Sequence, residues 1–293
     1  MSERSVVPTA ANDAASDLSS LAIQSVARRM APLGSSGVPT VGQVFRRRLP
    51  FARMLDRLLL RFVTLVARRQ VAAISGIEHI LGPQPFILAL NHSIKREAVI
   101  VPALLVFHRG GRLIHFWSDW VYRLVPGLAL ILRRAGTIVV ITKPGRPRAL
   151  NALKPLFAPA KPAIEQARAH LMAHRPIGVF PEGTVNRNRR RLLPGRYGTA
   201  RLSLETGVPV VPAGIVFPSA PAGSGPIPER ETMEIRIGAP LTPPHYAGAR
   251  PTHDEIRAWH ATIMREIARL SGKTWEPIRD SGEDRDEQAA AAA

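Results

Sequence analysis

The chain of 293 residues contains no cysteine. A disulfide framework, a thiolate zinc site and a cysteine nucleophile are therefore excluded, and the composition fits a reducing compartment. Aromatic residues make up only 5% of the chain, which leaves few rings on which the bases of a single-stranded nucleic acid could stack. Apolar residues nevertheless reach 45%, so the composition predicts a sizeable core and a folded protein.

Long hydrophobic runs are also missing. The best charge-free apolar run in a helical context covers residues 98–107, about half of the roughly 20 residues that a membrane span needs. Residues 206–228 form a longer uncharged stretch, but its prolines prevent it from being a helix. The first 30 residues lack the basic start and continuous apolar core of a secretory signal. The sequence thus predicts a soluble or peripheral protein.

Acidic residues are scarce. There are 22 of them against 40 basic residues, a net charge of +18, and the excess lies in residues 46–201, with 28 basic and 6 acidic side chains. Such a field attracts polyanions, namely nucleic acid, anionic lipid head groups or phosphorylated cofactors. Composition alone does not choose among these three.

Both ends of the chain differ from its middle. Residues 1–40 are rich in Ser, Ala and Pro without sustained periodicity, and we expect them to form a mobile tail. Residues 273–293 are acidic and end in five alanines, which predicts a second tail.

Residues 41–72 are expected to form a basic amphipathic helix. Arg53, Arg57, Arg61 and Arg68 fall on one side of a helix of 3.6 residues per turn. The opposite side carries apolar residues: Leu55, Leu58, Leu59, Phe62, Leu65 and Val66. This pattern is typical of a helix at a membrane surface, and equally of a surface helix that packs on the core with solvated arginines.

Residues 73–272 alternate between short apolar runs and helical patterns. Strands are expected at 86–90, 113–117, 137–142, 177–180, 208–217 and 232–237, and helices at 95–107, 163–174, 195–206 and 252–270. Thr252 and Glu255 have the spacing of a capping box at the start of the last helix. The alternation predicts an α/β fold with a mixed, mostly parallel sheet flanked by helices.

Two segments carry side chains suited to catalysis. His92 follows an expected strand and Glu97 begins the next helix, so the acid could orient the histidine as a general base. Glu182, Gly183 and Thr184 follow another expected strand, at the sheet edge where open α/β sheets bind ligands. Taken singly, a histidine with an acid five residues later is expected by chance, and Pro-Glu-Gly-Thr fits a plain turn.

In this order, the segments resemble the lysophosphatidate and glycerol-3-phosphate acyltransferase family. The first segment resembles the family's His-x4-acid motif, the second follows about 85 residues later, and residues 208–212 provide a third match. The stretches 75–80, 192–202 and 236–241 are similar to the surroundings of those motifs, so that the resemblance covers roughly residues 70–245.

The resemblance implies a glycerolipid acyltransferase fold and a reaction. His92 would remove the proton from an acceptor hydroxyl, which attacks the thioester of acyl-CoA or acyl carrier protein, while Glu97 orients His92. Glu182, Gly183 and Thr184 would line the acceptor site. No metal and no cofactor is implied beyond the acyl thioester as co-substrate.

This chain departs from the family pattern at three places. Glu97 stands where the family has Asp, and Val185 replaces the arginine after Glu-Gly-Thr. The family also has a glycine followed by a short strand and an arginine; here residues 136–142 match the glycine and the strand, and Lys143 stands in place of the arginine. Because a buried phosphate needs paired cationic donors, we expect Arg187, Lys143 and Arg196 to hold the phosphate of a lyso-phospholipid acceptor.

Several alternatives remain at this point. The acceptor could be a lipid without phosphate, such as a lyso-aminolipid or a glycolipid, or the protein could bind lipid without catalysis. Residues 187–191 include four arginines and could contact nucleic acid, but no helix-turn-helix or zinc-finger spacing is present, so we expect no nucleic-acid partner. We expect a peripheral enzyme on an anionic membrane surface, at the cytoplasmic face.

Overall fold

A computed structural model describes residues 36–141, 144–145, 147–218, 225–246, 248 and 250–277. Most of the two predicted tails lies outside these described residues, and so does Lys143. The strands are β1 (Val71–Ser75), β2 (Ile87–Leu90), β3 (His115–Asp119), β4 (Ile138–Val140), β5 (Ile177–Val179), β6 (Val210–Val216) and β7 (Met233–Ile237). The helices are α2 (Val41–Arg46), α3 (Met54–Ala67), α4 (Glu97–His108), α5 (Pro126–Arg134), α6 (Ala163–Met172), α7 (Gly198–Thr206) and α8 (His253–Ser271), with 3-10 helices η1 (Ile77–Ile80), η2 (Trp120–Leu124) and η3 (Arg148–Phe157).

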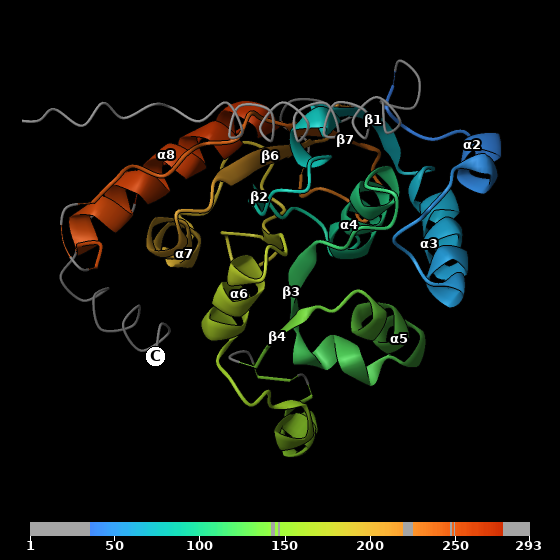
Figure 1. Ribbon diagram of the computed structural model, residues 1–293, viewed down its shortest axis with the longest axis horizontal. Coiled ribbons are helices and arrows are strands. Elements are labelled where there is room, and N and C mark those ends of the chain that lie inside the picture. The colour runs from blue at the N-terminus through green and yellow to red at the C-terminus, as the bar shows by residue number, and fades with distance from the viewer. Residues whose placement is uncertain are drawn as a thin grey trace, which may run out of the picture.

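The strands form one seven-stranded sheet in the order β1-β7-β6-β2-β5-β3-β4 (Figure 1). Neighbours are parallel except β6 and β7, so β1 and β7 run opposite to the other five strands. The predicted mixed, mostly parallel sheet flanked by helices is confirmed.

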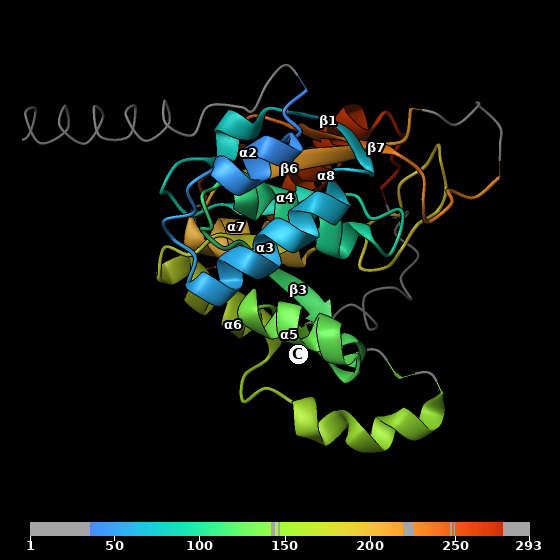
Figure 2. The same cartoon turned by 90° about the vertical axis from the view of Figure 1, so that its right-hand side faces the viewer.

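The central strand β2 is buried on both faces. Leu88 and Leu90 belong to the hydrophobic core that the sheet shares with α4, whereas Ile87 and Ala89 belong to the core shared with α6, α7 and α8. This alternation follows from the period of two residues in a strand. Figure 2 looks onto α3, which lies over α4 on the first of these faces. The sheet therefore presents its strand ends, rather than its faces, to a ligand.

The predicted elements largely match the structure, but the N-terminal part differs. β1 was not expected, because residues 71 and 72 were assigned to the helix at 41–72 and no strand was predicted at 73–75. Part of the predicted tail is held against it, since the Ile74 N–H donates to the Ser36 carbonyl at 2.8 Å. Thr40 then caps α2 in a capping box with Gln43.

The single helix expected at 41–72 is two helices, and Arg57, Arg61 and Arg68 of the second helix and its C-cap turn towards the protein. Arg57 Nε donates to the Ala52 carbonyl at 2.8 Å, and Arg68 Nε donates to the Pro39 carbonyl at 2.9 Å. Carbonyl groups of non-helical backbone need donors, and the arginine stripe provides them. Part of the apolar side of α3 is left exposed, with Leu58 at 61% and Phe62 at 65% exposure.

The residues just after the predicted boundary at 272 pack on the domain. Thr274 donates its N–H to the Arg190 carbonyl at 2.7 Å and accepts from the Leu192 N–H at 2.9 Å. Lys273 is buried, and only residues 278–293 of the predicted acidic tail lie outside the described residues. The end of α8 is thus fastened to the loop after β5.

We predict that Gly214 of β6 is required for the packing of α8 on the sheet. A Cβ at this position would lie 2.3 Å from the backbone of Leu270 and Ser271, which cannot move aside as a side chain can. Gly214→Ala should lower the free energy of unfolding by about 1–3 kcal/mol through overpacking. Gly127→Ala in α5 is the control, since a Cβ there meets nothing within 4 Å. Equal urea midpoints for the two variants would contradict the prediction.

Candidate active site

The two catalytic segments meet because β2 and β5 are adjacent and parallel. Residues 91–93 follow β2 and residues 180–184 follow β5, so both loops leave the same edge of the sheet. This is the edge at which open α/β sheets bind ligands. The structure thus brings together two segments that are about 85 residues apart in the sequence.

His92 and Glu97 form a hydrogen-bonded pair. The Nδ1 atom of His92 lies 3.0 Å from Oε2 of Glu97, and the Ser93 N–H donates to the same oxygen at 2.7 Å. The Glu97 side chain is fully buried, whereas 13% of the His92 side chain is exposed. An ionised carboxylate can only accept, so Nδ1–H donates and Nε2 remains available as a base towards solvent.

Burial dominates the electrostatics of Glu97. Desolvation raises the pKa of Glu97, while its hydrogen bond to His92, the charge of His92 and the Ser93 N–H act in the opposite direction. Among the described residues, its second oxygen has no hydrogen-bond partner. The charged form of this carboxylate therefore depends on the few groups that touch it.

An aromatic side chain holds the histidine ring in place. Phe180, the residue after β5, stacks on the His92 ring with 4.3 Å between ring centres, and the ring centre of Phe116 lies 5.9 Å from that of Phe180. Stacking and the bond to Glu97 together restrict both the tilt and the rotation of the imidazole. Such restriction is what a positioned general base requires.

Glu182 lies inside the protein, unlike its predicted place in an acceptor site. Its Oε1 accepts the His92 N–H at 3.0 Å, and its Oε2 accepts from Asn186 Nδ2 at 2.6 Å and from the Leu193 N–H at 2.9 Å. Both oxygens are thus engaged by protein groups. The structure gives this carboxylate the task of fastening the loop of His92 to the loop after β5.

Gly183, Thr184 and Arg196 lie together outside this network. Gly183 has φ of +67°, a conformation that favours glycine, and a Cβ there would lie 2.8 Å from Nε of the flexible Arg196 side chain. Thr184 is exposed. These groups remain candidates for contact with an acceptor.

The other predicted phosphate ligands are less well placed. Arg187 forms an ion pair with Glu229, whose carboxylate also accepts the Lys95 N–H at 3.1 Å. Arg189 and Arg191 pair with Glu231 and Glu276. Most of the arginine run at 187–191 is therefore neutralised by acids that are distant in the sequence.

Three polar residues of the site were not assigned a role from the sequence. Asn91 exchanges two hydrogen bonds with the backbone of Ile215, which pins the His92 loop to β6. The Asn186 N–H donates to the His92 carbonyl at 2.7 Å, and Lys273 reaches the site from beyond α8. Asn91 stands in the motif itself, but no sequence signal links Lys273 to a loop 180 residues away.

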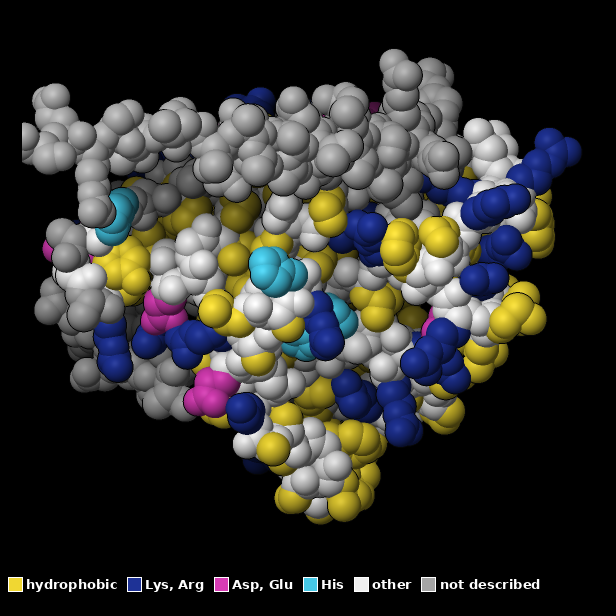
Figure 3. Space-filling view, viewed as in Figure 1, with side chains coloured by type: hydrophobic (Ala, Val, Ile, Leu, Met, Phe, Trp, Pro, Cys, Tyr) yellow, Lys and Arg dark blue, Asp and Glu magenta, His cyan; other side chains and the backbone are white. Residues whose placement is uncertain are grey.

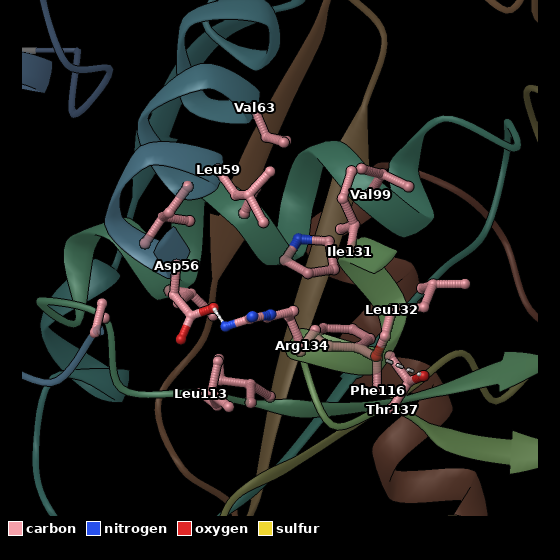
Figure 4. A pocket seen from close by; sticks show the side chains of 18 of the residues that line it. Asp56, Leu59, Val63, Val99, Leu113, Phe116, Ile131, Leu132, Arg134 and Thr137 are labelled. Carbon is pink, nitrogen blue, oxygen red and sulfur yellow. Dashed lines mark hydrogen bonds and ion pairs between the residues drawn. The ribbon is translucent and has the colours of Figure 1, made fainter. Parts of the chain in front are cut away.

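An apolar pocket lies next to the site, between α3, α4, α5 and β3 (Figure 4). Its volume is about 140 Å³. It begins at Ala98 and Val99, directly after Glu97, and its wall includes Phe116. An ion pair of 3.0 Å between Asp56 and Arg134 joins α3 to α5 at the pocket. The other lining side chains are mostly aliphatic, among them Leu59, Val63, Leu113, Ile131 and Leu132.

Comparison with known proteins shows which family the chain belongs to. The family model described as "Acyltransferase" matches residues 71–216, which include the His92–Glu97 pair and the loop after β5. No curated protein matches the chain. Among solved structures, it is similar to the 1-acyl-sn-glycerophosphate (LPA) acyltransferase PlsC from Thermotoga maritima, with 17% identity, a TM-score of 0.49 and coverage of 88% of this chain and 99% of that one. The chain belongs to the acyltransferase family.

Proposed function

We propose that the protein transfers a fatty acyl group from an acyl thioester, carried by CoA or an acyl carrier protein, to a hydroxyl of a lyso-phospholipid such as 1-acylglycerol-3-phosphate. The observation that carries the proposal is the buried Glu97 carboxylate bonded to Nδ1 of His92, beside an apolar pocket. This arrangement provides a base for the alcohol and a place for an acyl chain.

The reaction follows from the orientation of His92. Its Nε2 takes the proton of the acceptor hydroxyl as the oxygen attacks the thioester carbonyl carbon. The imidazolium then faces Glu97 at 3.0 Å, which stabilises the positive charge. When the tetrahedral intermediate collapses, the C–S bond breaks and the thiolate takes the proton back from His92. The new ester and a free thiol leave, with no covalent bond to the enzyme.

The apolar pocket supports the acyl part of the proposal. A dry cavity of about 150 Å³ accommodates benzene, so the 140 Å³ seen here holds roughly six carbon atoms. A longer chain therefore has to displace the Asp56–Arg134 ion pair or continue along exposed apolar side chains of α3.

Arg196 is the cation that best supports a phosphate-bearing acceptor. Its guanidinium lies against Gly183, within the surface that adjoins the His92 loop, whereas Arg187 is already paired with Glu229. That pairing favours the second candidate, an acyltransferase acting on a lipid without phosphate. The two acceptors make different demands on Arg196, which provides a test.

We extend the proposal to a peripheral position on the cytoplasmic face of a membrane. The exposed apolar side chains of α2, α3 and the loop between them, here called the apolar face, are Val41, Phe45, Phe51, Met54, Leu55, Leu58, Phe62 and Val66. Figure 3 shows hydrophobic side chains together with Lys and Arg over these helices. Exposed Arg46, Arg48 and Arg53 flank this face and suit anionic head groups. Among the described helices, none has the length and apolar content needed to cross a bilayer.

We predict that His92→Ala lowers kcat/KM by about 10²–10⁴, the usual contribution of a general base. Glu97→Gln should cost less, because the base remains and only the countercharge of the imidazolium is lost. His79→Ala in η1 is the control. The assay follows thiol release from a long-chain acyl thioester with a lyso-phospholipid, with the product identified by mass spectrometry. Near-normal turnover by folded His92→Ala would end this mechanism.

A second prediction separates the two acceptor classes. Arg196→Ala should raise KM for a lyso-phospholipid with a phosphate monoester by about tenfold or more, with little change for an uncharged monoacylglycerol, because a charge-assisted bond contributes about 1.5–3 kcal/mol. Arg187→Ala, which loses a cation already paired with Glu229, should have the smaller effect. Equal use of both acceptors by the unmutated protein would favour the acceptor without phosphate.

A third prediction concerns the membrane. Replacing Leu58 and Phe62 with Ser should weaken binding to anionic vesicles by at least about tenfold, since each buried apolar side chain contributes about 1.5–3 kcal/mol. Their exposure predicts little change in thermal stability. Met172→Ser in α6, an equally exposed side chain on another helix, is the control. If salt abolishes vesicle binding and the double substitution does not affect it, the arginines alone make the membrane contact.

A further inference from the structure

A lysine from the far end of the chain lies beneath the catalytic loop. Lys273 follows Gly272, which ends α8 with φ of +67°, and the Lys273 side chain is buried, with 7% exposure. The neighbouring residues hold the segment in place, since Trp275 Nε1 donates to the Pro194 carbonyl at 2.9 Å. The position lies outside residues 71–216, which the family model matches.

The ammonium group of Lys273 is bonded to both loops of the site. Its Nζ donates to Ser93 Oγ at 2.9 Å and to the Asn188 carbonyl at 2.7 Å. Ser93 in turn donates its N–H to the Glu97 oxygen that receives His92 Nδ1. Lys273 is therefore linked to the general base through two intervening residues, Ser93 and Glu97, with its own bond at the Ser93 side chain and the Glu97 bond at the Ser93 backbone.

The charges around Lys273 are arranged to hold an ammonium there. Glu97 of α4 and Glu182 after β5 attract it, and Arg189 of the following loop repels it. Arg189 itself is paired with Glu231 at 2.8 Å, so its charge is largely balanced. Burial lowers the pKa of Lys273, and the two carboxylates oppose that shift. The positive charge of Lys273 and the negative charges of the two carboxylates each reduce the free-energy cost of burying the other.

We propose that Lys273 is a positioning residue for acyl transfer, whose ammonium group keeps the His92–Glu97 pair in its base form by balancing the Glu97 and Glu182 carboxylates. It does not touch the reacting atoms and acts through Ser93 and Glu97. The inference rests on the proposed function for its link to turnover, but the charge balance itself can be measured without any acceptor.

The sign of the effect follows from electrostatics. A nearby positive charge disfavours the binding of a further proton, so Lys273 favours the form of the pair in which His92 is neutral and Glu97 is ionised. Removing that charge lets the pair take up its proton more readily, and the pair titrates as a unit. Without Lys273 the base form of the pair then appears only at higher pH. The expected displacement is about one pH unit, the order of magnitude for removing one nearby charge inside a protein.

The test uses two substitutions of Lys273 and two controls. Lys273→Met removes the charge and both hydrogen bonds, and Lys273→Gln removes the charge but keeps a donor. Trp275→Phe loosens the same segment without changing its charge, and Lys161→Met removes an exposed lysine elsewhere. For each protein we would measure the thermal midpoint, the acid limb of the pH profile of kcat/KM, and the pH at which the His92 ring signals shift in NMR, assigned with His92→Gln.

Both Lys273 variants should move the acid limb and the His92 signals to higher pH by about one unit, with both controls at the wild-type position. The inference is overturned if folded Lys273→Met and Lys273→Gln retain the wild-type titration and lose only thermal stability, as Trp275→Phe should. If no lyso-lipid is acylated by the wild-type protein, the proposed function fails. The NMR titration still decides the charge balance in that case.

Discussion

The geometry of the site depends on one buried carboxylate, that of Glu182. It accepts three hydrogen bonds, from the N–H of His92, from Asn186 Nδ2 and from the N–H of Leu193. Hydrogen bonds to a charged acceptor are stronger than neutral ones, and leaving such an acceptor unpaired inside a protein is costly. The loop after β2 therefore cannot move independently of the loop after β5. This coupling fixes the position of His92, and contacts with Glu97 and Phe180 fix the orientation of its ring.

The protein as a whole is strongly basic, with a net charge of +18, yet its site is organised around buried acids. Glu97 and Glu182 each accept backbone N–H groups, and Lys273 adds a cation from a segment that closes onto the loops from behind. Surface arginines at 187–191 bond to acids from other segments. The basic excess thus serves partly to fasten loops, and what remains exposed, such as Arg46 and Arg53, flanks the apolar face.

The apolar face and the apolar pocket lie on the same side of the sheet. α3 contributes Leu59 and Val63 to the pocket and Leu58 and Phe62 to the exposed surface. The helix can do both because its arginines turn to the carbonyls of residues 39–52 instead of to solvent. In the function that we propose, an acyl chain in the pocket and a membrane at the exposed side are separated by the thickness of a single helix.

The sequence by itself determined the fold class and most strands and helices, because these depend on local periodicity. It predicted the pairing of His92 with Glu97 only through the ordered resemblance of several motifs, since a histidine with an acid five residues later occurs by chance. It could not determine which side of the 54–67 helix faces the protein, since an amphipathic pattern is satisfied by either arrangement until the carbonyls that need donors are in place. The tertiary structure alone decided that Glu182 lies inside, that Arg187 is paired with Glu229, and that Lys273 belongs to the site. Each of these is a contact between segments 42 to 180 residues apart, and such contacts leave no periodic trace in a single sequence.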